Sequence, residues 1–132
     1  ARSVVYFDAD GDGDLDMVVN NFNDSAIVYR NNADTNGNNW LKLRLIGDLK
    51  KGVTRDAIGA RILVDTDSQK GIWREVFSTI GYLSVHPKEQ HVGLGKAQSA
   101  DVTVLWPNGD RETFRGVESG RSYTIAQGEG IR

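Results

Sequence analysis

The sequence predicts an all-β fold, in which a β-sandwich-like body follows an N-terminal β-hairpin unit with an aspartate-rich loop. Short apolar runs recur about every ten residues and alternate with turn residues, a spacing typical of sandwiches and barrels. No apolar repeat of about 3.6 residues lasts long enough to indicate a helix. The composition, 39% hydrophobic and 26% charged over 132 residues, is that of a soluble globular domain with a substantial core.

Three strands are expected in the N-terminal unit, at residues 4–7, 17–20 and 26–30. They carry β-branched and aromatic residues, as in Val4-Val5-Tyr6-Phe7 and Met17-Val18-Val19. The aspartate-rich loop at residues 8–16 lies between the first two. We therefore expect this loop to join two strands.

Seven strands are expected in the body, at residues 40–46, 59–65, 73–79, 90–94, 101–106, 112–115 and 122–126. Pro107-Asn108-Gly109 is a turn signature, because proline fixes φ and Asn-Gly tolerates positive φ. The strands on either side of this turn should form a hairpin.

The loop Asp8-Ala9-Asp10-Gly11-Asp12-Gly13-Asp14-Leu15-Asp16 predicts a Ca²⁺ site. Five carboxylates so close together would repel one another without a cation, and Ca²⁺ takes six to eight oxygen ligands at about 2.3–2.6 Å. Gly13 supplies the sharp turn. The expected carboxylate ligands are Asp8, Asp10, Asp12 and Asp16, with the backbone oxygen of Asp14 as a further ligand.

Three alternatives to a Ca²⁺ hairpin fit the sequence less well. An EF-hand would need a bidentate Glu at the twelfth loop position, where Val19 stands, and helices on both sides. A solvated flexible turn is the default interpretation of any Asp/Gly run, but here apolar strands fix both ends of the loop. Mg²⁺ fits less well, because it prefers few protein ligands and retained waters.

Charge and composition bear on partners. The net charge is −2, so the chain outside the five loop aspartates carries +3. Without a polybasic run or a basic stripe with interleaved aromatics, no nucleic acid partner is expected. No apolar stretch approaches 18 residues, so no membrane span is expected. Cysteine is absent, which excludes disulfides and thiolate metal sites.

The polar stretch at residues 31–39 is predicted to be a linker or an exposed loop, and it divides the chain at residues 1–36 and 37–132. A three-stranded unit is marginal by itself, so it is expected to pack on the body or on another neighbour. The chain begins Ala-Arg-Ser, and we expect a monomeric fragment of a larger, exported chain.

Two resemblances follow from these motifs. The segment from Phe7 to Asn21, followed by Ile27-Val28-Tyr29-Arg30-Asn31, resembles an FG-GAP or VCBS calcium-binding repeat. The rest is similar to the ASPIC/UnbV domain of the cartilage acidic protein-like family, in five motifs: residues 39–45, 58–61, 81–84, 91–95 and 104–109. Residues 1–36 would then be a single repeat and residues 37–132 the ASPIC/UnbV-like sandwich. The family implies secreted or surface-exposed proteins in adhesion or recognition roles.

Aromatic and histidine side chains offer further candidates. Trp73, in a polar setting, and Tyr82, on a loop-like segment, are the candidate exposed residues for stacking on a ligand. Trp40 and Trp106 lie in alternating apolar strands and are expected in the core. His86 and His91 flank a Pro-Lys-Glu loop, a poor frame for zinc, and are expected to be surface or hydrogen-bonding residues.

These observations favour a calcium-binding, non-enzymatic, extracellular or cell-surface module of recognition or adhesion, with a glycan or an extracellular protein as ligand. Millimolar extracellular Ca²⁺ would keep even a weak site occupied. One alternative is a structural spacer or assembly module of a larger exported protein. A hydrolase using aspartates or His91 is the other, but the acidic residues are concentrated in one loop that suits metal ligation better than proton transfer. No catalytic residue is predicted.

Overall fold

The computed structural model describes residues 1–33 and 37–132, in two compact units. The first unit comprises Ala1–Asn36 and Ser78–Pro87, and the second comprises Gly37–Phe77 and Lys88–Arg132. The segment Ser78–Pro87, which the sequence prediction placed in the body, thus belongs to the first unit. The predicted linker at residues 31–39 and the division at residue 36 fall partly outside the described residues.

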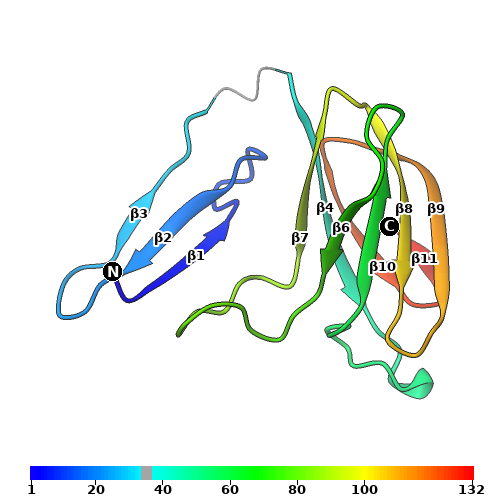
Figure 1. Ribbon diagram of the computed structural model, residues 1–132, viewed down its shortest axis with the longest axis horizontal. Helices are drawn as coiled ribbons and strands as arrows, with labels where there is room; N and C mark the ends of the chain where they lie inside the picture. Colours follow the sequence, from blue (N-terminus) through cyan, green and yellow to red (C-terminus); the bar gives the residue numbers. More distant parts are fainter. Residues whose placement is uncertain (34–36) are drawn as a thin grey trace. The chain divides into compact units, whose positions relative to one another are not determined.

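The first unit contains a three-stranded antiparallel sheet in the order β1-β2-β3 (Figure 1). Its strands are β1 (Ser3–Phe7), β2 (Asp16–Asn20) and β3 (Ile27–Tyr29). Strand β1 pairs with β2 from Ser3↔Asn20 to Phe7↔Asp16, so the aspartate-rich loop connects two antiparallel strands as predicted. β-Branched side chains fill these short strands, which suits a pleated backbone.

Side chains of Ser78–Pro87 cover the free edge of β1. The Ser84 hydroxyl accepts a hydrogen bond from the backbone N–H of Val4 (3.3 Å), and His86 Nδ1 accepts one from that of Tyr6 (3.4 Å). The rings of Tyr6 and His86 also stack, with their centroids 6.1 Å apart. Two alternate N–H groups of the edge strand β1 therefore have hydrogen-bond acceptors.

The second unit is a sandwich of two four-stranded sheets, in the orders β11-β10-β4-β7 and β6-β5-β8-β9. One sheet contains β4 (Asn39–Ile46), β7 (Gln90–Gly95), β10 (Arg121–Ala126) and β11 (Gly130–Ile131). The other contains β5 (Arg61–Asp65), β6 (Ile72–Glu75), β8 (Ser99–Leu105) and β9 (Arg111–Glu118). A single 3₁₀ turn, η1 (Leu49–Lys51), follows β4.

Alternating apolar side chains from both sheets form the core of the sandwich. On β4, Leu41, Leu43 and Leu45 are buried, while Arg44 between them is exposed. Strands β5 and β8 bury Ile62, Val64, Val102 and Val104 in the same cluster. This period of two is the pattern that the sequence showed, and it confirms the predicted all-β, sandwich-like fold.

The hairpin predicted around Pro107-Asn108-Gly109 is present. Strands β8 and β9 pair antiparallel from Val102↔Phe114 to Leu105↔Arg111, and Gly109 has a φ of 96°. In contrast, β4 and β10 pair in parallel, from Arg121↔Leu41 to Ala126↔Ile46. Residues far apart in the chain are thereby joined in one sheet.

Three details differ from the prediction. Strand β6 ends at Glu75, because the chain leaves for the first unit after Phe77. Strand β11 was not expected, since its two residues are too short for a periodic pattern. Trp40 is half-buried and lies outside the core cluster, where it stacks on His91 at 6.2 Å, whereas Trp106 is 3% exposed and belongs to the core. Among the described residues, no helix is long and apolar enough to cross a membrane.

Candidate metal centre

The aspartate-rich loop is held at both ends by the β1–β2 ladder, which places Asp8 directly after the pair Phe7↔Asp16. Two glycines make the chain turn within the loop. Gly11 has a φ of 80° and Gly13 a φ of 97°, a backbone region that residues with a Cβ rarely adopt. The turning role predicted for Gly13 is confirmed.

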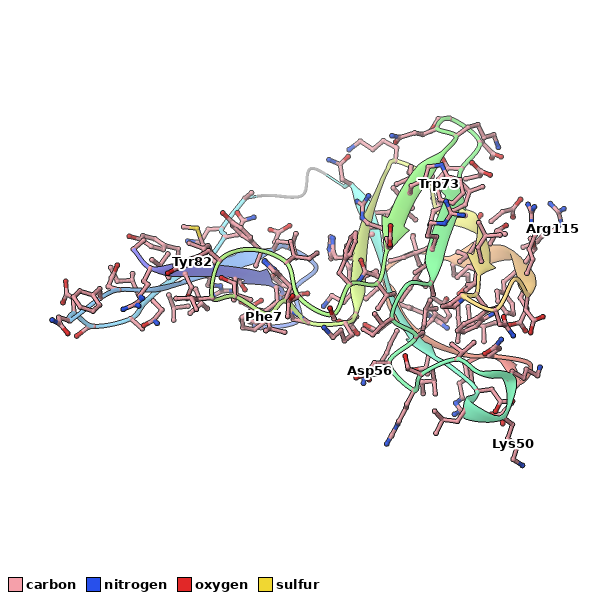
Figure 2. The ribbon with its side chains drawn as sticks, turned by 60° about the horizontal axis from the view of Figure 1, so that its bottom comes forward. Phe7, Lys50, Asp56, Trp73, Tyr82 and Arg115 are labelled. Atoms are coloured by element: carbon pink, nitrogen blue, oxygen red, sulfur yellow. The ribbon has the colours of Figure 1, made fainter. Side chains whose placement is uncertain are left out.

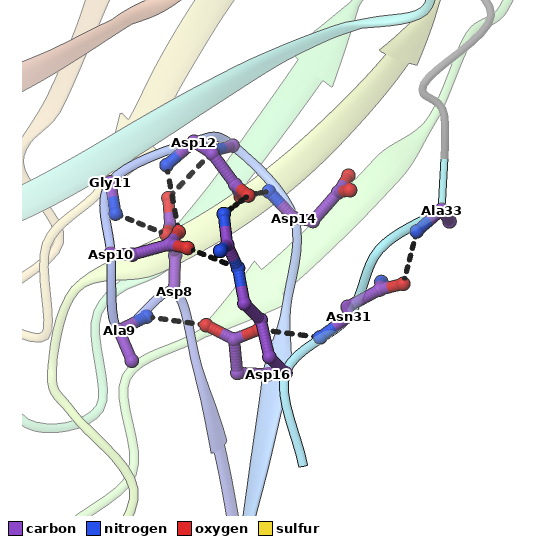
Figure 3. Close-up of polar contacts among 11 residues, drawn as sticks. Asp8, Ala9, Asp10, Gly11, Asp12, Asp14, Asp16, Asn31 and Ala33 are labelled. Carbon is purple, nitrogen blue, oxygen red and sulfur yellow. Dashed lines mark hydrogen bonds and ion pairs between the residues drawn. The ribbon is translucent and has the colours of Figure 1, made fainter.

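Three of the five loop aspartates converge. Asp8, Asp10 and Asp16 each offer a carboxylate oxygen, and these atoms all lie within 4.8 Å of one another (Figure 3). Asp16 is 2% exposed and Asp8 half-buried, while Asp10 lies at the surface. Like charges at this spacing in a partly desolvated loop favour the uptake of a cation.

Backbone N–H groups fix the two inner carboxylates. Asp16 accepts from the N–H of Ala9 (2.9 Å) and, across the sheet, from that of Asn31 (2.8 Å). Asp8 accepts from the N–H of Gly11 (2.7 Å) and from that of Gly13 (2.9 Å). Each bond uses one lone pair of an oxygen, which leaves further acceptor capacity on the same atoms for a cation.

Arg30 is a protein counter-charge at the rim of the loop. Its Nε lies 2.7 Å from Asp10 Oδ2, and its Nη2 lies 3.6 Å from Asp12 Oδ2. The Arg30 side chain is 64% exposed, so water screens these pairs. One guanidinium offsets one of five carboxylate charges, and a strongly negative loop remains.

The donor set suits a hard divalent cation by its chemistry. Two ligands on opposite sides of one ion are separated by at most twice the metal–oxygen distance, which is about 4.6–5.2 Å for Ca²⁺ and about 4.0–4.2 Å for Mg²⁺. The separations here are at most 4.8 Å, so the three oxygens can share one divalent ion. Carboxylate oxygens on a glycine-turned loop are also the ligands that this hard cation prefers.

Asp12 and Asp14, the other predicted ligands, are not in the group of three. Asp12 Oδ1 accepts from the backbone N–H of Asp14 (2.9 Å), and the Asp14 side chain is half-buried. The sequence analysis did not identify Arg30 and Asn31 as neighbours of the loop. The pairing Met17↔Tyr29 places both next to Asp16, so the register of the β2–β3 hairpin was the signal that could have found them.

The candidate stacking residues lie in different units. Trp73 projects from β6 in the second unit and is 47% exposed, and Tyr82 lies on the Ser78–Pro87 loop of the first unit and is 74% exposed (Figure 2). His86 accepts a backbone hydrogen bond, as expected of a hydrogen-bonding residue.

Residues 50–132 match the profile of the family described as ASPIC and UnbV. The chain belongs to this family. The match begins after β4, although β4 pairs with both β7 and β10 and is an integral strand of the sandwich. The family resemblance predicted for the body is confirmed.

Three relatives share the name cartilage acidic protein 1. The chain is 32% identical to the protein of Homo sapiens over 126 residues, which cover 93% of this chain and 18% of the relative. It is 32% identical to the proteins of Mus musculus and Xenopus tropicalis, over 80% and 77% of this chain and 16% of each relative. The chain therefore spans less than a fifth of their length. The similarity to the human protein extends into the first unit.

Proposed function

We propose that this chain is a calcium-stabilised, non-enzymatic recognition module that works in an extracellular setting. One observation carries the proposal: the carboxylates of Asp8, Asp10 and Asp16 converge on a loop that two β-strands hold in place. Three carboxylates at this spacing suit a hard divalent cation. A proton-transfer site would instead need an acid and a base that converge in a cleft.

Ca²⁺ would act structurally in this account. Bound by Asp8, Asp10 and Asp16, and supplemented by Asp12 and by the backbone oxygen of Asp14, it would offset the negative charge of the loop. A ligand that binds only the folded chain adds its binding free energy to the stability of that chain. We further propose that residues 1–36 are a single FG-GAP/VCBS-like repeat and residues 37–132 the ASPIC/UnbV-like domain.

The extracellular setting rests on two supports. Millimolar extracellular Ca²⁺ suffices to occupy a site of modest affinity. The relatives carry the name of a cartilage protein, and cartilage is a tissue rich in matrix. A glycan or an extracellular protein is the ligand that such a module would recognise.

A spacer or assembly role is the second candidate, and the apolar surface of the first unit favours it. Among the described residues, ten of the thirteen large apolar side chains that are exposed belong to the first unit, including Phe22, Val28 and Leu83. Apolar side chains exposed in this number suit a contact surface. In this role the first unit would dock on a neighbouring domain.

The calcium proposal is tested by calorimetry of the full chain in chelator, in millimolar Ca²⁺ and in millimolar Mg²⁺. At a concentration of about 100 times the Kd, Ca²⁺ should add about 2.7 kcal/mol to the free energy of unfolding, which raises the midpoint by several degrees. The variant Asp10→Asn keeps the shape of the side chain but removes its charge, and it should lose most of this rise.

Asp24→Asn is the matched control, since Asp24 is an exposed aspartate of the same unit outside the group of three. It should keep the full response to Ca²⁺. In NMR spectra, Ca²⁺ should move the amide signals of Gly11 and Gly13, which donate to Asp8. A midpoint that does not change with Ca²⁺, or that rises equally in Asp10→Asn, would show that the loop is not a calcium site.

A further inference from the structure

An open hollow of about 480 Å³ lies on the second unit beside the edge strand β6, far from the aspartate loop in sequence. Its lining is mixed in chemistry: two guanidinium groups, one carboxylate and two aromatic rings, from Arg61, Arg74, Glu75, Trp73 and Phe77. Such a combination offers hydrogen-bond donors, an acceptor and apolar ring faces to one ligand.

Trp73 and Arg61 line the hollow together. The guanidinium carbon of Arg61 lies 5.7 Å from the centroid of the Trp73 ring, in a cation–π contact that orients both groups. The strand register pairs Leu63 with Trp73 and Arg61 with Glu75, so all four side chains lie on one face of the sheet.

Both groups are open to a ligand. Trp73 remains 47% exposed even with the guanidinium near it. Within the part of the chain that the structure describes, no carboxylate lies within ion-pair distance of Arg61. An exposed arginine without a carboxylate partner, held beside an indole, is poised to bind an anion.

The Arg74 side chain forms hydrogen bonds at the edge strand β6. Its Nη1 donates to the backbone oxygen of Trp73 (2.8 Å), and its Nε donates to that of His91 on β7 (3.2 Å). A peptide that added itself to β6 as a further strand would have to displace these bonds. This arrangement disfavours an extended acidic peptide as the occupant.

The charge of the second unit suits an anionic ligand. It holds fourteen of the sixteen Lys and Arg residues and eleven of the eighteen Asp and Glu residues, which gives a formal charge of +3. The first unit carries the remaining two basic and seven acidic residues, a charge of −5. An anion is therefore attracted to the unit that contains Trp73.

We propose that the Trp73 hollow binds an acidic saccharide, one that carries carboxylate or sulfate groups beside free hydroxyls. The apolar C–H face of a sugar ring packs on the indole, and Arg61 binds the anionic substituent through its fork of N–H donors. Glu75 accepts hydrogen bonds from hydroxyl groups. A purely anionic ligand would be repelled by this carboxylate, which favours a saccharide. This inference rests on the recognition role proposed above and names its ligand class.

NMR titration of the ¹⁵N-labelled full chain in Ca²⁺ tests the proposal. The probes are a sulfated heparin hexasaccharide, a carboxylated hyaluronan hexasaccharide, a neutral cellohexaose and a hexa-aspartate peptide. The indole N–H signal of Trp73 should move with at least one acidic saccharide. The indole of Trp106 is an internal control, because it is buried and donates to Glu112 at 2.6 Å.

Two variants and two matched controls locate the site. Trp73→Ala and Arg61→Ala should each weaken binding of the acidic saccharide about tenfold. Tyr29→Ala removes an exposed aromatic ring from β3 of the first unit, and Arg121→Ala removes an exposed arginine of β10 that pairs with Glu118. Both should leave the affinity within about twofold, as expected if binding depends on a site and not on net charge.

The proposal is overturned if no acidic saccharide binds, if Trp73→Ala binds as well as the native chain, or if cellohexaose or hexa-aspartate binds as tightly as the acidic saccharides. Its failure is distinguishable from failure of the calcium proposal, which calorimetry measures without any saccharide. Saccharide binding at Trp73 together with an unchanged unfolding midpoint in Ca²⁺ would support this inference and reject the calcium site.

Discussion

Asp16 is the most buried aspartate of the loop, and its position shows how one residue serves both the fold and the candidate site. Its two carboxylate oxygens accept from the backbone N–H groups of Ala9 and Asn31, which ties the loop to the chain that follows β3. Removing it would deprive both N–H groups of their acceptor, at a cost of about 0.5–1.5 kcal/mol for each hydrogen bond lost, whether or not a metal binds. Asp10, at the surface, is therefore the cleaner position for testing the metal.

Gly47 offers a prediction that concerns packing alone. A Cβ at this position would lie 2.1 Å from the backbone oxygen of Thr54 and 2.5 Å from Cγ1 of Val53. Since the backbone cannot move aside cheaply, Gly47→Ala should lower the free energy of unfolding by about 1–3 kcal/mol. Denaturant unfolding followed by tryptophan fluorescence measures this directly, because all three tryptophans belong to the second unit.

Gly93→Ala is the control for this substitution. Gly93 lies exposed on β7, and a Cβ there would have no heavy atom within 4 Å. The midpoint of Gly93→Ala should stay within about 0.5 kcal/mol of the native value. Equal loss of stability in both variants would show that glycine is needed at these positions for a reason other than space.

At the scale of elements, the sequence pattern did not predict how the free edge of β1 is covered. Val4 and Tyr6 donate to Ser84 and His86, residues about eighty positions away in the chain. Both pairs step by two residues, which matches the alternation of outward N–H groups along an edge strand. Ser78–Pro87 therefore protects β1 with side chains where a further strand would have used its backbone.

Ser84→Ala should expose this edge. With the hydroxyl removed, the Val4 amide loses its acceptor, and its hydrogen exchange should become about tenfold faster. Exchange measured by NMR on the full chain tests this. Thr79→Ala changes a hydroxyl of the same segment that is exposed, and it should leave the exchange of Val4 unchanged. An unchanged rate in Ser84→Ala would contradict the proposed protection of β1.

At the scale of the whole molecule, the two units differ in how much apolar surface they bury. All seventeen residues of the core cluster lie in the second unit. Among the described residues of the first unit, Val19 is the one buried large apolar side chain. A three-stranded sheet with so little core has little hydrophobic free energy with which to offset the entropy of ordering its chain.

Two fragments test this difference. A chain of residues 37–132 should unfold cooperatively in urea, because it retains every member of the core cluster. A peptide of residues 1–36 should show no strand signal in circular dichroism, even with Ca²⁺, because it lacks both a core and the side chains that cover β1. A folded 1–36 peptide would show that the loop and its metal suffice to order this unit.

The amino-acid sequence by itself determined the β-strands, the β8–β9 hairpin and the clustering of aspartates. The strands follow from a period of two, the hairpin from its turn residues, and the aspartate cluster from ligands that are close together in the chain. The aspartate loop could be found because its members are neighbours in sequence. The Trp73 hollow could be predicted only in part. The polar residues around Trp73 suggested an exposed ring, but the cation–π contact with Arg61 depends on strand register.

Only the tertiary structure decided three other features: the parallel pairing of β4 with β10, the membership of Ser78–Pro87 in the first unit, and the ion pairs of Arg30 with the loop. Each joins residues that are distant in the chain or separated by a hairpin. Such pairings are selected by the packing of the whole core and by strand register, which no local pattern of residues encodes.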